Sequence, residues 1–193
     1  MRKVTVADIP ELRAYNETRD ELRASIIALK SRRRVHLGTI ITMVFENFDT
    51  VRWQICEMMR VERIGTDEAL ANEVAIYNEL IPQLGELSCT LFLELTEDGA
   101  MREWLPKLVG IHDAIEFLLP DGTTVRGYDP KAERLTRQEA TTAVHFLKFA
   151  FTPAQVASFR SGPVTVASVH PAYTEAIMLN VDTHAELTVD FDT

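Results

Sequence analysis

The sequence predicts a single α+β domain in which a mixed or mostly antiparallel sheet packs with helices, including an N-terminal helical region and a helical hairpin. The 193 residues are 46% hydrophobic and 25% charged, as is typical of a globular domain with a proper core. Segments with helical spacing and segments with strand alternation both occur along the chain. No internal repeat or linker interrupts it, so the expected domain covers residues 1–193.

Two helical pieces are expected at the N-terminus. Asp8 is followed by Glu11, which fits a capping box at the start of a helix. Thr18 and Glu21 repeat this signal before a longer apolar-periodic run. The basic residues 32–34 then fall in the last turn of the second helix, where cations suit the helix dipole.

A strand and the helical hairpin are expected next. Residues 35–46 are rich in β-branched and apolar side chains, which favours one buried strand. Asp49 or Thr50 caps a helix, and Thr66 caps a second helix that ends at Pro82. These two helices form the predicted hairpin.

The second half of the chain predicts mainly strands. Residues 87–95 alternate strictly between apolar and other side chains, which indicates a strand. The turn at 120–122 (Pro-Asp-Gly) predicts a hairpin between 115–119 and 123–128. The remaining expectations are a helix at 99–109, a loop at 129–142, a strand at 143–151, a short helix at 152–162, and strands at 164–169 and 173–179.

The charge distribution bears on compartment and partners. The net charge is −9, but residues 1–34 carry an excess of positive charge, and no Lys or Arg follows Arg160. Phosphate backbones would repel the acidic remainder, so nucleic acid is disfavoured as a partner. The longest apolar stretch, 38–45, is too short to cross a bilayer, and the first residues lack the apolar region of a secretory signal. We expect a cytoplasmic protein without a membrane partner, with Cys56 and Cys89 as buried thiols.

Polar residues placed among apolar ones give the candidate site. The common nucleotide-binding, zinc-protease, hydrolase and thioredoxin motifs are absent from the sequence. On the helix from residue 50 to 64, Glu62 lies at the angular centre of the apolar stripe formed by Val51, Ile55 and Met58. A carboxylate that faces inward needs a partner, because burying an unpaired charge is costly. Candidate partners are Arg32, Arg33, Arg34, His145 and His170.

Three interpretations of that partnership stay open. The first is a structural ion pair, or a helix end at which Glu62 reaches solvent. The second is an anion pocket, in which the arginines bind a carboxylate or phosphate ligand. The third is a divalent-metal pocket in which acidic residues join His145 and His170. Taken singly, His36, His112 and His184 are expected to be ordinary residues without a polar cluster.

Several short motifs occur in one order along most of the chain. They include Arg32-Arg33-Arg34-Val35, Phe45-Glu46-Asn47, Tyr77-Asn78-Glu79-Leu80, Ala143-Val144-His145-Phe146 and His170-Pro171-Ala172-Tyr173. With these motifs the chain resembles an uncharacterised bacterial family, the domain of unknown function 3501. The resemblance implies a bacterial cytosolic protein encoded beside rubrerythrin-like di-iron proteins and iron–sulfur subunits. It therefore implies an accessory role in peroxide defence or iron-dependent redox chemistry.

Two functions follow from the sequence. The first is a non-catalytic binding or accessory protein for a rubrerythrin-type redox system, with no cofactor of its own. Its partners would be a rubrerythrin-like or iron–sulfur protein, or a second copy in a homodimer. Its pocket would be lined by Arg32, Arg33, Arg34, Glu46, Asn47, Glu62 and His145. The alternative is a metal-dependent enzyme that holds a divalent metal with Glu57, Glu62, Glu73, His145 and His170.

Overall fold

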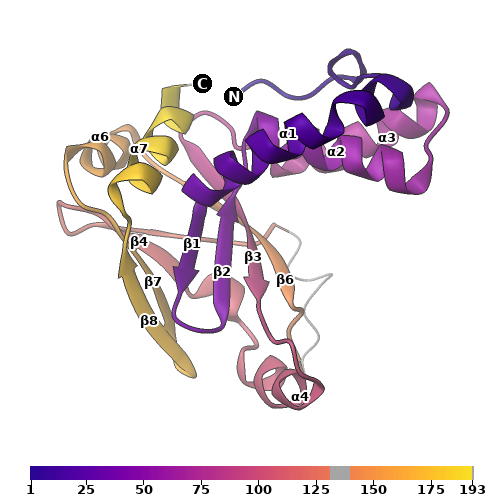
Figure 1. The fold of residues 1–193 in the computed structure, drawn as a ribbon. Helices are drawn as coiled ribbons and strands as arrows, with labels where there is room; N and C mark the ends of the chain where they lie inside the picture. The colour runs from indigo at the N-terminus through magenta and orange to yellow at the C-terminus, as the bar shows by residue number, and fades with distance from the viewer. Residues whose placement is uncertain (131–139, 193) are drawn as a thin grey trace.

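A computed structural model describes residues 1–130 and 140–192 and places the strands of these residues in two antiparallel sheets of four strands each (Figure 1). Sheet A has the order β1-β2-β3-β6 and sheet B the order β5-β4-β7-β8. The strands of sheet A are β1 (Arg34–Leu37), β2 (Ile41–Phe45), β3 (Glu86–Leu93) and β6 (Val144–Ala150). Those of sheet B are β4 (Ile115–Leu118), β5 (Thr124–Arg126), β7 (Thr165–His170) and β8 (Tyr173–Met178). The predicted α+β class with mostly antiparallel pairing is confirmed.

The helices lie in two groups around the sheets. The helical arm, which projects from one end of sheet A, consists of α1 (Leu12–Arg32), α2 (Phe48–Glu62) and α3 (Asp67–Tyr77). At the opposite end of the molecule lies α4 (Asp98–Lys107), while α6 (Pro153–Ser161) and α7 (Val181–Val189) lie beside the base of the arm. Short 3-10 helices occur at Val6–Asp8, Asn78–Leu80, Ile111–Asp113 and Asp190–Asp192. No helix in these ranges combines the length and the apolar character that crossing a membrane requires.

Side-chain caps explain where the hairpin of α2 and α3 begins. Asn47, rather than the predicted Asp49 or Thr50, caps α2, because its side chain accepts a hydrogen bond from the Thr50 backbone N–H. The hydroxyl of Thr50 accepts in return from the Asn47 N–H at 2.9 Å. Thr66 caps α3 as predicted, by accepting from the N–H of Ala69.

Two predicted elements differ from the structure near the N-terminus. The expected strand 35–46 is two strands, because Gly38 has a φ of 65° and turns the chain back on itself. The two expected N-terminal helices are a single helix, α1, which begins at Leu12; Asp8 does not cap it but ends a separate 3-10 helix. Thr18 does not cap a second helix, because its hydroxyl donates to the carbonyl oxygen of Ala14 one turn earlier. Both errors come from local signals that the surrounding structure overrides.

The sequence interpretation missed helix α7. Its cap is Asn180, whose side chain accepts from the Thr183 N–H at 2.8 Å. The helix buries Thr183 and Leu187, and the following turn buries Asp190 and Phe191. The acidic C-terminal residues therefore form a packed element of the fold.

Two hydrophobic clusters hold the fold together. The larger lies between the sheets and includes the inward residues of β3, which are Leu87, Cys89, Leu91 and Leu93. The smaller lies within the helical arm and is built around Tyr15, Val51, Ile55 and Leu70. Cys56 belongs to the arm cluster, and both cysteines are free and buried, as predicted.

The two sheets meet at both of their edges. On one side, Tyr128 and Lys148 form an isolated antiparallel bridge between the chain after β5 and strand β6. On the other side, the hydroxyl of Tyr173 in β8 donates to the Leu37 carbonyl at 2.8 Å and accepts from the Ile40 N–H at 3.0 Å. Tyr173 thereby satisfies backbone groups of the turn between β1 and β2.

Candidate functional site

Arg33, from the predicted arginine cluster, is a fully buried link between distant parts of the chain. Its Nε donates to the carbonyl oxygen of Phe45 at 2.8 Å, and its Nη2 donates to that of Glu46 at 3.1 Å. Its charge is matched by the carboxylate of Asp190, which it holds through two nitrogens, and by Glu186 at 3.3 Å. Arg33 therefore has a partner, but the partner comes from the acidic C-terminal segment and not from Glu62.

The other two arginines are exposed, and Arg32 borders a surface pocket together with residues 180–183 at the start of α7. Arg32 Nε lies 2.9 Å from a carboxylate oxygen of Glu186, and Arg34 is exposed on β1. Arg32 and Arg33, at the end of α1, are thus paired with acidic residues of α7 and of the turn that follows it. The structural ion pair is the interpretation that the geometry supports for the arginines.

The expectation that Glu62 faces the interior is wrong. Glu62 is the last residue of α2 and is exposed, whereas Ile55 and Met59 are buried. Arg63 adopts a left-handed conformation with a φ of 53° and ends the helix, so the Glu62 side chain reaches solvent. A helical projection gives the direction of a side chain, but it does not show how far along the helix the neighbouring elements cover it.

Glu57, a candidate metal ligand, is held by neighbours within the arm. Arg19 donates to its two carboxylate oxygens at 2.8 and 2.9 Å, and the Tyr15 hydroxyl donates at 2.6 Å. Arg60 adds a contact of 3.4 Å. The hydrogen bonds from Arg19 are the main cause that lowers the pKa of Glu57 from 4.5 to about 2. This carboxylate, on α2, thus links α2 to α1 through hydrogen bonds and an ion pair.

The lowered pKa of Glu57 predicts a pH-dependent contribution to stability. A depressed carboxyl pKa stabilises the fold above the unfolded value of 4.5, and the contribution is lost as pH falls toward about 2. Glu57→Gln is therefore expected to lower the free energy of unfolding by about 1 kcal/mol or less at neutral pH, since the pair is partly exposed. Near pH 2 the variant and the parent protein should be almost equally stable. Urea unfolding of both at the two pH values measures the difference, with exposed Glu17→Gln as control; an equal difference at both values contradicts the assignment.

His145 lies in a buried polar group at the end of the sandwich nearer α4. It is fully buried on β6, with Nε2 2.9 Å from the Thr141 hydroxyl and Nδ1 3.5 Å from a carboxylate oxygen of Asp129. Its ring stacks on that of His112, with centroids 5.4 Å apart. The expectation that His112 lacks a polar cluster is therefore wrong, because the chain after α4 brings it beneath sheet A.

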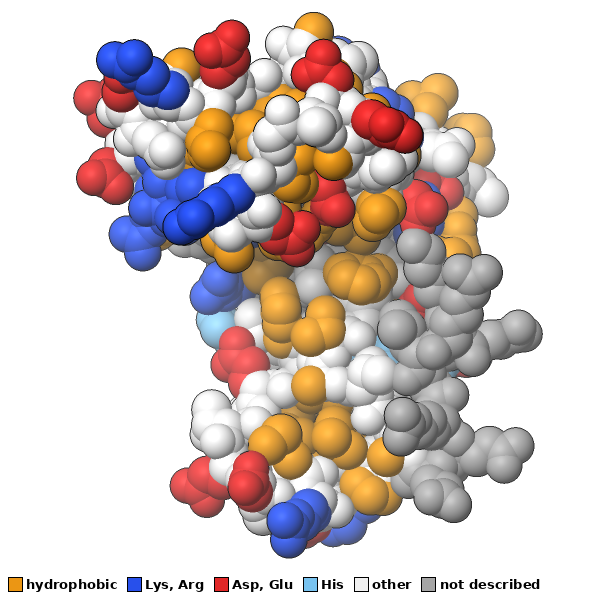
Figure 2. Space-filling model, turned by 90° about the vertical axis from the view of Figure 1, so that its right-hand side faces the viewer, with side chains coloured by type: hydrophobic (Ala, Val, Ile, Leu, Met, Phe, Trp, Pro, Cys, Tyr) orange, Lys and Arg blue, Asp and Glu red, His pale blue; other side chains and the backbone are white. Residues whose placement is uncertain are grey.

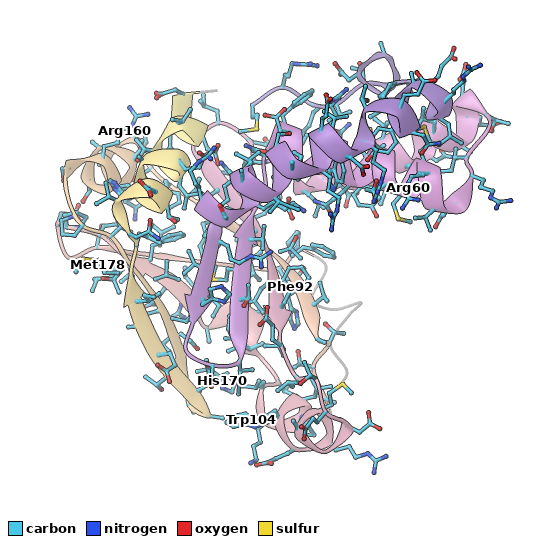
Figure 3. All side chains as sticks on the ribbon, viewed as in Figure 1. Arg60, Phe92, Trp104, Arg160, His170 and Met178 are labelled. Carbon is cyan, nitrogen blue, oxygen red and sulfur yellow. The ribbon has the colours of Figure 1, made fainter. Side chains whose placement is uncertain are left out.

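The predicted metal ligands lie in different parts of the molecule. His170, at the end of β7, has Nε2 3.0 Å from the Val109 carbonyl oxygen and accepts from the Ala172 N–H at 3.2 Å. Figure 3 shows His170 near α4, far from Arg60, which contacts Glu57 on the helical arm. Within residues 1–130 and 140–192, no group of three His, Cys, Asp or Glu side chains is arranged to hold a metal ion.

A pocket of about 250 Å³ lies between α3 and the outer face of sheet A. Figure 2 shows hydrophobic side chains on this side of the molecule, from the helical arm down over the strands. The helical wall presents Glu73, Ile76 and Tyr77, and the sheet wall includes Ser88, Phe146 and Lys148. Glu46 also lines the pocket, at the end of β2. Two residues of the predicted sites, Glu46 and Glu73, thus come together here.

The carboxylate of Glu46 is the unusual feature of this pocket. Glu46 is only 3% exposed. Thr90 donates to one carboxylate oxygen at 2.6 Å, while Thr50 and Gln54 donate to the other at 2.6 and 3.0 Å. All three donors are neutral. Among the described residues no Lys, Arg or His nitrogen forms an ion pair with this carboxylate.

Other charged groups lie at the pocket wall. Lys148 Nζ is 3.4 Å from a carboxylate oxygen of Glu86, so its charge is already matched. Burial, with a further contribution from the charge of Glu73, raises the pKa of the Tyr77 hydroxyl. The wall is thus apolar with more acidic than basic side chains.

The sequence interpretation missed most of the pocket. Tyr77 and Phe146 occurred only in the motifs of the family resemblance, and Lys148 only within the predicted strand 143–151. One usable signal was the polar face of β3, on which Ser88 and Thr90 alternate with the inward apolar residues. Polar residues on the covered face of a strand indicate a buried polar partner. For Thr90 that partner is Glu46, and for Ser88 it is the carbonyl oxygen of Leu80.

Comparisons with known proteins concern nearly the whole chain. A family model described as "Protein of unknown function (DUF3501)" matches residues 3–191. A crystal structure of a novel protein of unknown function from Burkholderia pseudomallei K96243 is similar, with a TM-score of 0.91 and 33% identity. That similarity covers 99% of this chain and 100% of the other. No curated protein matches the chain significantly.

Proposed function

Because this chain belongs to the DUF3501 family of proteins of unknown function, its function has to come from its own geometry, and we propose that it is a non-catalytic binding protein. The binding site is the pocket between α3 and sheet A. The observation that carries the proposal is a mainly apolar cavity with a buried carboxylate in its wall. Such a combination of apolar walls and a few fixed polar groups is typical of small-molecule sites.

The hydroxyl groups of Ser88 in the pocket wall, and of Thr50 and Thr90 behind it, support binding rather than catalysis. Ser88 donates its hydroxyl to the carbonyl oxygen of Leu80. Thr50 and Thr90 donate theirs to Glu46. Thr50 and Thr90 are buried and do not line the pocket, so their hydroxyls fix the carboxylate instead of facing a ligand. Their arrangement holds the carboxylate in place.

Octanol, a neutral apolar molecule, is a suitable probe of this proposal. We expect saturable binding of octanol, seen as amide chemical-shift changes confined to residues around Ile76, Tyr77 and Phe146. Ile76→Ser removes apolar surface from the pocket wall and should weaken the affinity about tenfold. Val61→Ser, at an exposed position on α2, serves as the matched control. Scattered shifts, or equal affinities for both variants, would contradict a binding site here.

A redox partner is a separate part of the proposal, supported by the family resemblance. The expected partner is a rubrerythrin-like di-iron protein or an iron–sulfur protein. Mixing the purified proteins at tens of micromolar should give a light-scattering mass larger than that of either alone. The chain measured by itself tests the predicted homodimer. If each protein keeps its own mass in the mixture, the proposed redox partner is wrong. The proposed binding pocket is not tested by that result.

The metal-dependent enzyme remains the alternative prediction, although its five candidate ligands are dispersed. Glu57 is held by Arg19 and Tyr15, and Glu62 is exposed. Elemental analysis of the purified protein tests this alternative. Bound iron, manganese or zinc, together with a higher melting temperature on adding that metal, would support the enzyme over the binding protein.

A further inference from the structure

We infer that the ligand of this pocket is a small apolar primary amine, bound as its ammonium ion against the carboxylate of Glu46. The inference rests on the proposed function and adds the class of ligand. It starts from the position of Glu46, which the sequence places at the junction of β2 and α2, where it is almost fully buried.

The first step concerns the charge of Glu46. Burying a carboxylate without a cation is costly, even when neutral groups hydrogen-bond to it. The buried cation nearby is Arg33, but it donates to the backbone oxygen of Glu46, and its ion pairs are with Asp190 and Glu186. A cationic ligand would therefore supply the charge that the described side chains do not bring to this carboxylate.

The second step concerns the number of hydrogen bonds. Two carboxylate oxygens offer about four acceptor positions. Thr90 takes one on the first oxygen, and Thr50 and Gln54 take two on the other. One acceptor position is left, on the oxygen that Thr90 contacts. An ammonium group can use a single position, whereas the fork of a guanidinium needs two acceptors on one free edge.

The third step concerns the rest of the wall. Glu73 adds negative charge on the helical side, and Lys148 is paired with Glu86. This balance attracts a cation and disfavours an anionic ligand. Ile76 and Phe146 provide apolar surface for the body of the ligand. The volume of about 250 Å³ is slightly below the roughly 300–1,000 Å³ of drug-sized sites, which fits a small amine.

The test compares three probes with the same chain length: octylammonium, octanol and octanoate, titrated calorimetrically into the protein at neutral pH. We expect octylammonium to bind at least about tenfold more tightly than octanol, and octanoate to bind most weakly. Glu46→Gln should abolish the preference for octylammonium over octanol. Glu62→Gln, which makes the same change at an exposed glutamate, should preserve it.

The outcomes separate this inference from the function on which it rests. If octanol and octylammonium bind the parent protein equally well, the ammonium inference is wrong and the apolar binding site stands. If octanoate binds most tightly, the inference is also wrong, and Lys148 is then the residue that binds the charged group of the ligand. If none of the probes binds, both proposals fail. The comparison of probes on the parent protein decides the question even if Glu46→Gln does not fold.

Discussion

Replacing Arg33 with methionine is expected to lower the free energy of unfolding by about 3–5 kcal/mol, the range for breaking one side of a buried ion pair. The substitution removes five hydrogen bonds to four groups. Two of the five go to the carboxylate of Asp190, which is itself buried. Burial raises the pKa of Asp190, and the hydrogen bonds from Arg33 oppose that rise. Without Arg33 the buried acid loses its two hydrogen bonds from the guanidinium and the largest of the charge interactions that offset its desolvation.

Urea unfolding followed by circular dichroism measures this effect. Arg34→Met makes the same change one residue along, at an exposed position, and should alter stability by about 0.5 kcal/mol or less. Adding Asp190→Leu to Arg33→Met should recover part of the loss, because the buried acid that Arg33 pairs with is then removed as well. Similar stabilities for Arg33→Met and Arg34→Met would show that the ion pair is not a main support of the fold.

Phe117→Ala is expected to cost about 3–5 kcal/mol, the range for emptying a buried aromatic position. Phe117 lies fully buried on β4. The centroid of its ring is 4.8 Å from that of Phe149 and 5.9 Å from those of Phe45 and Phe159. The ring therefore joins sheet B to two strands of sheet A and to α6. Its removal leaves a cavity that the surrounding strands cannot fill without breaking their register.

Differential scanning calorimetry checks this prediction. Leu118→Ala, at the next residue of β4, removes an exposed side chain and should change stability by about 1 kcal/mol or less. Both substitutions lie on β4. One removes a side chain from its buried face and the other from its exposed face. Equal losses would mean that the contact between the sheets contributes little beyond the strand itself.

Local signals predicted many of the elements of the fold. The alternation in 87–95 gave the position of β3, and Thr66 gave the start of α3, because each depends on residues close in sequence. The prediction of one strand at 35–46 was wrong because it also used only residues close in sequence. Gly38 is the only glycine in that apolar run, and its turn depends on packing against Tyr173 and Glu175 of β8.

The site was less predictable, because its partners are far apart in sequence. Arg33 was expected to have an acidic partner, but Asp190 follows it by 157 positions, and no periodicity connects the two. Glu46 was among the predicted residues, although its donor Thr90 lies 44 positions away. Glu62 failed because a helical pattern does not show where a neighbouring element stops covering the helix.

The hydroxyl of Tyr173 at the seam between β1 and β8 has a consequence for the behaviour of the protein at high concentration. Strands at the open edge of a sheet can pair with the edge of another molecule and start aggregation. Here the β1–β2 turn is fastened to β8 by two hydrogen bonds through one side chain. Loss of that hydroxyl, as in Tyr173→Phe, should free both edges together and make the protein prone to intermolecular strand pairing before it loses its fold.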